Sequence, residues 1–161
     1  MRKQQGFSLI ELLIVVAIIL IIAAIAIPNL IRSKISANEA SAVASIRSVT
    51  VAEVQYASTY PNLGFADSLQ KLGPTSGTPS PDAAGLLDPA VAKGEKSGYR
   101  FTLTPTKGSG SNGQTTGFTI VAEPTAPGAS GIRSFCSDQT NVLYYKADGS
   151  TCVPGTSPTL E

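Results

Sequence analysis

The feature that most constrains this chain is a run of sixteen consecutive apolar residues, from Leu12 to Ile27. With its flanks the stretch extends from Phe7 to Ile31, or roughly 37 Å as an α-helix at about 1.5 Å per residue. That length is enough to cross the hydrocarbon core of a bilayer, which is roughly 30 Å thick. Every face of this helix would be apolar, and no comparable second helix exists to cover it, which argues against a globular core helix. The sequence therefore predicts a transmembrane helix over 7–31.

The residues before the apolar run differ from an ordinary secretory signal. Residues 1–6 are short, basic and polar, and the small residue Gly6 precedes the apolar stretch instead of following it. Arg2 and Lys3 favour a cytoplasmic N-terminus, although Arg32 and Lys34 on the far side weaken that bias. We therefore expect a single-pass helix with the C-terminal part of the chain outside.

A carboxylate, Glu11, lies inside this apolar segment, between Ile10 and Leu12. A charged side chain in lipid costs a few kcal/mol even on the mildest scales, so such residues normally have a partner and a function. The helix dipole also favours an acidic residue near a helix N-terminus, but it does not explain why this one would be immersed in lipid. We therefore expect Glu11 to have a functional partner.

The apolar run continues into a segment, 32–60, whose apolar residues recur at steps of three, four or seven. This spacing predicts an amphipathic helix with one apolar face, formed by Ile35, Ala42, Ile46, Val49 and Tyr56. Charged residues, including Glu39 and Glu53, are expected mostly on its other faces. The helix should end near Tyr60, because Pro61 cannot continue it cheaply. Pro28, inside the long helix, should kink or loosen it.

The rest of the chain predicts loops, short helices and a small sheet. Residues 61–98 are rich in Gly, Pro and Ser, with short helices near 65–73 and after Asp88, which would act as N-cap. Residues 99–161 contain four strand candidates, which are 99–104, 118–123, 132–136 and 142–147. The expected fold is α+β, with the amphipathic half of the helix packed on an antiparallel sheet of about four strands.

The composition argues against several functional classes. Twelve Lys and Arg balance 11 Asp and Glu, which gives no basic excess for specific nucleic-acid binding. The chain has no histidine, the commonest general base and metal ligand, so we predict neither an enzyme nor a metal or cofactor site. Asp138, Asn141 and Asp148 have oxygen atoms that suit calcium, but they lack the spacing of an EF-hand and also fit ordinary turns.

The N-terminal segment "GFSLIELLIVVAIILIIAAIAIP" closely resembles the start of type IV pilins and of the pseudopilins of type II secretion. The resemblance covers about thirty residues, and the segment is most like that of a type IVa pilin. It implies a leader over 1–6, cleavage between Gly6 and Phe7 by a prepilin peptidase, and methylation of the new amine of Phe7. It also implies an assembly role for Glu11, and Pro28 matches the helix-breaking proline of the family.

The resemblance further implies a precursor held in the bacterial inner membrane and polymerised into a helical surface filament, the pilus. The partners would be other copies of the chain, the prepilin peptidase, an assembly platform and a cytoplasmic ATPase. The alternative is a pseudopilin of a type II secretion system, which shares the N-terminal segment. In either assembly, Glu11 could neutralise the amine of Phe7, within one chain or between neighbouring chains, and so fix their register.

Two cysteines, Cys136 and Cys152, lie near the C-terminus. Many type IV pilins close this region with a disulfide, and the resemblance implies the same here. In an exported domain a disulfide is also the expected state, with free thiols as the alternative. The pair favours a pilin over a pseudopilin.

Overall fold

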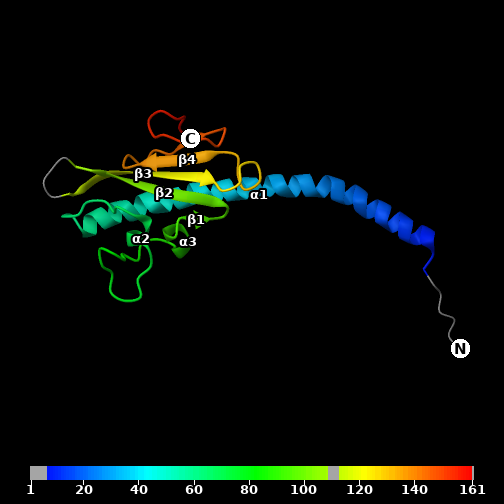
Figure 1. The fold of residues 1–161 in the computed structure, drawn as a ribbon, viewed down its shortest axis with the longest axis horizontal. Helices are drawn as coiled ribbons and strands as arrows, with labels where there is room; N and C mark the ends of the chain where they lie inside the picture. Colours follow the sequence, from blue (N-terminus) through cyan, green and yellow to red (C-terminus); the bar gives the residue numbers. More distant parts are fainter. Residues whose placement is uncertain (1–6, 109–112, 161) are drawn as a thin grey trace. The chain divides into compact units, whose positions relative to one another are not determined.

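The computed structural model describes residues 7–108 and 113–160, and its secondary structure confirms the α+β class (Figure 1). One long helix comes first, followed by two short helices and five short strands. These elements are α1 (Leu9–Thr59), α2 (Leu69–Leu72), α3 (Pro89–Ala92), β1 (Glu95–Lys96), β2 (Tyr99–Lys107), β3 (Thr115–Pro124), β4 (Ser134–Asp138) and β5 (Tyr144–Lys146).

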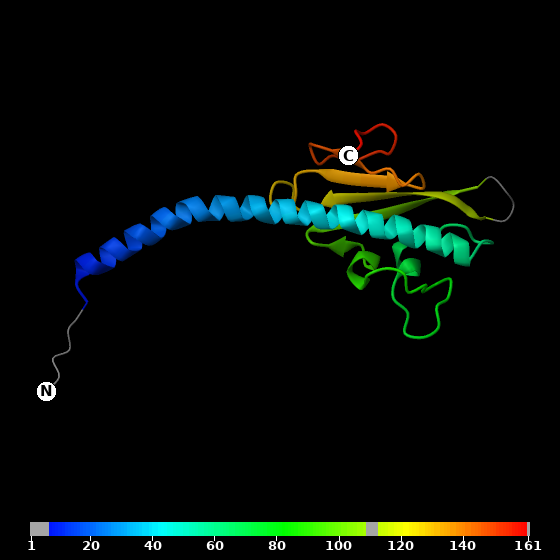
Figure 2. The ribbon, with the colours of Figure 1, turned by 180° about the vertical axis from the view of Figure 1, so that it is seen from behind.

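The chain divides within α1 into two units, Met1–Lys34 and Ile35–Glu161. The first unit contains the apolar part of α1. The second contains the remainder of α1, the short helices and the sheet (Figure 2). The helix itself continues without interruption across Pro28.

In the second unit, α1 buries the face that its apolar spacing predicts. The buried side chains on this face include Ile35, Ala42, Ile46, Val49 and Tyr56. All of these except Ile35 pack in one hydrophobic core with residues of the sheet, such as Tyr99, Phe118, Ile120 and Phe135. A one-sided helix stabilises this unit because the sheet removes its apolar stripe from water.

Two charged residues on α1 do not lie where the sequence analysis placed them. Glu39 and Glu53 were expected on solvent faces, but both are buried, with Glu53 completely so. Each follows a buried apolar residue, Ile35 or Val49, by four positions, which places it on the same helix face. The prediction for these two residues was wrong because it took their charge as a sign of exposure, although their spacing places them on the buried face.

The five strands form one antiparallel sheet in the order β1-β2-β3-β4-β5. The expected number was about four, and the additional strand is β1. It pairs Glu95 with Arg100 and Lys96 with Tyr99 across a two-residue turn in which both Ser97 and Gly98 have positive φ. A strand of two residues is too short to show alternation in the sequence, so only the turn could have indicated it.

The main hairpin is longer than its apolar alternation predicts. Strand β2 continues from 104 to Lys107 and β3 begins at Thr115 instead of 118, because backbone pairing extends past the last alternating apolar residues. Strands β4 and β5 pair as the second predicted hairpin, from Ser134↔Lys146 to Cys136↔Tyr144. The C-terminal tail adds one further backbone bridge, Tyr144↔Thr159.

The two short helices lie where the loop segment predicts them. Helix α3 has Asp88 as N-cap, with its side chain accepting from the backbone N–H of Ala90 at 2.8 Å, and Pro89 as its first residue. Gly94 follows the helix with a φ of 88°, a conformation that glycine adopts without strain. Leu69 and Leu72 of α2 and Val91 of α3 are buried in the core.

Candidate processing and assembly site

The first turn of α1 contains the carboxylate that the sequence analysis singled out. Glu11 Oε2 accepts a hydrogen bond from the backbone N–H of Ser8 at 2.9 Å, and Leu12 N–H donates to Ser8 C=O at 3.3 Å. Ser8 therefore stands immediately before the helix, with Glu11 as the third helical residue. Phe7, just before them, is 83% exposed.

This hydrogen bond is one half of a capping box. In the motif Ser-x-x-Glu, the glutamate side chain returns to the N–H of the capping residue, which has no partner within the helix. The carboxylate also lies at the positive end of the helix dipole. The sequence Ser8-Leu9-Ile10-Glu11 already contains this signal, which the explanation of Glu11 by a charged partner alone did not use.

The apolar side chains of the first unit are exposed almost throughout. Large examples include Leu13 at 61%, Ile21 at 63% and Leu30 at 70% exposed. By length and composition, α1 is the one helix among the described residues that could cross a membrane, and none of its most apolar window is buried. A face of this kind in water is unfavourable, so it requires lipid or other apolar helices around it.

Gly6 and Pro28 are the other two residues of the predicted site. Gly6 and the rest of the expected leader lie outside the described residues. Pro28 lies within α1, and the helix continues on both sides of it. Proline lacks the backbone N–H that would close the preceding turn, so the helix has one hydrogen bond fewer here.

In the second unit, Cys136 and Cys152 form a disulfide. Cys136 belongs to β4 and Cys152 to the C-terminal tail, and both are buried. The tail beyond them returns to β5, where Tyr145 N–H donates to Pro158 C=O at 2.9 Å and Leu160 N–H to Leu143 C=O at 2.8 Å. The disulfide thus fastens the tail to the sheet.

The aspartates that were considered for calcium bind their own turns instead. Asp138 Oδ1 accepts from the N–H of Thr140 at 2.9 Å, and Asp148 Oδ1 accepts from the N–H of Ser150 at 3.0 Å. The two hydrogen bonds from Ser150 hold the pKa of Asp148 below its ordinary value. Over 7–108 and 113–160, no group of three or more His, Cys, Asp or Glu side chains is arranged to hold a metal ion.

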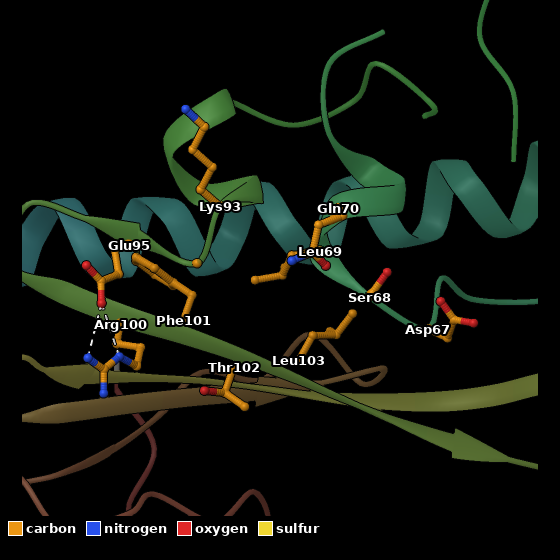
Figure 3. A pocket seen from close by; sticks show the side chains of 11 residues that line it. Asp67, Ser68, Leu69, Gln70, Lys93, Glu95, Arg100, Phe101, Thr102 and Leu103 are labelled. Carbon is orange, nitrogen blue, oxygen red and sulfur yellow. Dashed lines mark hydrogen bonds and ion pairs between the residues drawn. The ribbon is translucent and has the colours of Figure 1, made fainter. Parts of the chain in front are cut away.

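A hollow of about 350 Å³ lies among α2, α3, β1 and β2 (Figure 3). Its charged lining residues are mostly paired. Arg100 is 3.1 Å from Glu95, and Asp67 is 3.0 Å from Lys71 next to the hollow. Such exposed pairs are ordinary surface features, and we assign no chemistry to this hollow.

Comparisons with known proteins find matches over short parts of the chain. The family described as "Prokaryotic N-terminal methylation motif" matches residues 1–27. The chain is 59% identical over 39 residues to the "Type IV wide pilus major component PilA4" of Thermus thermophilus, a stretch covering 24% of this chain and 30% of that protein.

Two other relatives match similar stretches. The chain is 43% identical over 54 residues to the "Type IV major pilin protein PilA" of Myxococcus xanthus, covering 34% of this chain and 24% of that protein. It is 46% identical over 46 residues to the "Type II secretion system core protein G" of Vibrio cholerae, covering 29% of this chain and 32% of that protein. No solved structure matches the chain.

These matches span only between 24% and 32% of the length of the relatives. At its N-terminus the chain carries the methylation motif over residues 1–27, and over short stretches it is similar to two major components of type IV pili and to a type II secretion protein.

Proposed function

We propose that this chain is the precursor of a type IV pilin, a structural subunit that is stored in the membrane and polymerises into a surface filament. The observation that carries the proposal is the exposed apolar half of α1, which begins two residues after Phe7 and has Glu11 in its first turn. Such a helix is stable in lipid as a monomer and in a bundle of like helices as a polymer. The chain acts as a building block and not as an enzyme.

Processing would occur between Gly6 and Phe7, with removal of the leader 1–6 and methylation of the amine of Phe7. The matching methylation motif over residues 1–27 supports this step. A prepilin peptidase would carry it out, and an assembly platform with its ATPase would extract the mature subunit. The precursor would lie in the inner membrane with its C-terminal unit outside, and the assembled pilus would be extracellular.

Glu11 would set the register of the polymer. Cleavage creates a charged amine on Phe7, which is costly in an apolar bundle unless a carboxylate neutralises it. In the present structure the Glu11 carboxylate accepts a hydrogen bond from Ser8 N–H, so it already points back along the chain towards the new terminus. In a filament, Glu11 of one subunit would pair with the amine of Phe7 in the next.

Pro28 would be the point at which α1 yields during assembly. The turn before it, 23–27, lacks one backbone hydrogen bond, so it costs least to open. Local melting there would let the rod lengthen in the filament while the second unit keeps its fold.

A second candidate function is a pseudopilin of a type II secretion system. It is favoured by the match to the Vibrio cholerae protein named as a core component of that system. The disulfide near the C-terminus supports the pilin. Within that group, a type IVa pilin is proposed from the resemblance of the N-terminal segment alone.

Isolation of surface filaments tests the proposal. Filaments sheared from cells and identified by mass spectrometry should contain this chain as a component that begins at Phe7. A matched culture in which the prepilin peptidase has been deleted should yield no filaments. A chain that is cleaved normally but never appears in surface filaments would contradict the pilin and support the pseudopilin.

A further inference from the structure

Glu53, on α1, is completely buried, and its two carboxyl oxygens have unlike surroundings. Oε2 accepts a hydrogen bond from the backbone N–H of Ala66 at 2.8 Å. Oε1 is buried and has no hydrogen-bond partner among the described residues. A carboxylate needs several donors when it leaves water, so this environment suits the neutral acid better than the ion.

The segment that Glu53 contacts, 61–68, follows the end of α1 and is here called the exit segment. Its first part is tied to the helix end, since Leu63 and Gly64 N–H donate to Tyr60 C=O at 2.9 and 3.2 Å. Its middle pairs with the start of β3, where Phe65 N–H donates to Thr115 C=O at 3.1 Å. The bond to Ala66 is the tie that joins the exit segment to the body of α1 through a side chain.

A neighbouring negative charge also opposes the ionisation of Glu53. Asp67, in the exit segment, is the charged neighbour that acts on Glu53, and it pairs with Lys71 of α2 at 3.0 Å. Two further charges act on the pKa of Tyr56, three positions further along α1: Lys71 lowers it and Asp82 raises it. Burial, opposed by the hydrogen bond from Ala66 N–H and reinforced by the charge of Asp67, raises the pKa of Glu53 to about 7.

We propose that Glu53 is a proton-operated latch, whose neutral form holds the exit segment on α1 and whose ionised form releases it. In the neutral acid, Oε2 acts as the carbonyl that accepts from Ala66, and Oε1 carries the proton. Loss of that proton leaves a bare charge with one oxygen unpartnered in an apolar core. Water must then reach it, and Ala66, itself only 1% exposed, has to move for that to happen.

All parts of the latch lie in the second unit, which on the proposed function faces the outside of the cell. A domain that faces the outside of a cell meets the pH of its surroundings. The mobility of the exit segment, at the start of the loop 61–98, would then follow external pH in the neutral range.

Hydrogen exchange of the full-length chain in detergent micelles tests the latch. After correction for the intrinsic base-catalysed rate, exchange at Ala66 and its neighbours in the exit segment should rise about tenfold between pH 6 and pH 8. Glu53→Gln keeps an oxygen for the Ala66 N–H and has no charge, so its exchange should stay flat over the same range. Glu95→Gln, at an exposed pair, should behave as wild type.

Wild-type exchange that does not change with pH, or a pH dependence that Glu53→Gln retains, would overturn the latch. Should Glu53→Gln fail to fold, Asp67→Asn decides. This exposed substitution removes the charge that raises the pKa of Glu53, so the midpoint of opening should move to lower pH if Glu53 is the titrating group. A midpoint that stays where it is in wild type would overturn the latch.

Discussion

Glu39 on α1 holds the turn between β3 and β4 through both of its carboxyl oxygens, and its partner is Arg133. Oε1 accepts from the backbone N–H groups of Ile132 and Arg133 at 3.0 and 3.1 Å, while Oε2 lies 2.7 Å from the Arg133 guanidinium. The guanidinium also lies over the rings of Phe135 and Tyr145, at 5.4 and 5.9 Å from their centroids. A helix and a turn more than ninety residues apart in the sequence are thus joined at one carboxylate.

Removal of this carboxylate should destabilise the second unit. Glu39→Ala leaves two backbone N–H groups and a half-exposed guanidinium without their acceptor, at a cost of about 2 kcal/mol. Glu95→Ala, which breaks the exposed pair with Arg100, should cost well under about 1 kcal/mol. Chemical unfolding of the full-length chain in micelles measures both, and equal losses would show that the Glu39 contact is no stronger than a surface pair.

The stability of the second unit should pass through a maximum in mildly acidic solution. Burial alone would raise the pKa of Glu39, but hydrogen bonds from Arg133 and Ile132 outweigh it and lower the pKa below 4.5. That contribution is present above pH 4.5 and is lost as the pH falls through the lowered pKa. The pKa of Glu53 is raised from 4.5 to about 7, so its neutral form favours the folded state. The stability that this gives is fully present below pH 4.5 and is lost as the pH rises through 7.

Thermal unfolding as a function of pH separates the two carboxyls. Wild type should be most stable at about pH 5. Its free energy of unfolding should fall by up to about 3 kcal/mol by pH 8, and this loss comes from Glu53. In Glu53→Gln the decline above pH 5 should vanish, while in Glu39→Gln the loss on the acid side should shrink. A decline of undiminished size in Glu53→Gln would assign it to another group.

Glu11→Ala should be cleaved normally but form few or no filaments, so that mature monomer accumulates in the membrane. Loss of the Glu11 carboxylate leaves the amine of Phe7 unpaired in an apolar bundle, whereas storage of the monomer in lipid should become easier. The variant also loses the acceptor of Ser8 N–H, which weakens the helix start by about 1 kcal/mol. Surface filaments and the membrane pool are quantified side by side.

Glu11→Gln is the matched control for this experiment. It keeps an oxygen for Ser8 N–H but has no charge, so it isolates the ionic role from capping. We expect it to resemble Glu11→Ala, and Glu11→Asp to be intermediate because its charge is drawn back by one methylene. Abundant filaments from Glu11→Gln would mean that the residue serves the helix start alone.

Replacement of Cys136 and Cys152 by serine should loosen the C-terminal tail without affecting cleavage after Gly6. The disulfide closes a loop with a sequence separation of 16, which is worth about 3 kcal/mol on the chain-entropy model. Limited proteolysis should cut the tail faster in the double variant, and filament yield should fall. Two alkylatable thiols in wild-type filaments would contradict the role of this disulfide.

Mature subunits should begin at Phe7 with a methylated amine. Loss of the leader removes Arg2 and Lys3, which leaves ten basic against 11 acidic side chains and changes the side-chain balance from +1 to −1. Intact-mass measurement on purified filaments checks the terminus and the methyl group together. Retention of Met1 in filaments would refute the proposed processing.

The sequence by itself determined the features whose cause is local. An unbroken apolar run makes a membrane-length helix whatever follows it, and the one-sided spacing from Ile35 to Tyr56 marks its buried face. Asp88 and Pro89 start a helix through groups within one turn. The proposed processing site could also be named from sequence, because Gly6, Phe7 and Glu11 are neighbours in the chain.

The tertiary structure alone decided which polar groups the core would enclose. Glu39 and Glu53 share the helical spacing of the buried apolar residues, yet their partners, the turn at Ile132 and the N–H of Ala66, come from distant or irregular segments. The two-residue strand β1 likewise exists only because β2 is there to pair with it. Helix periodicity is a property of consecutive residues, whereas the burial of a carboxylate depends on what another part of the chain places over it.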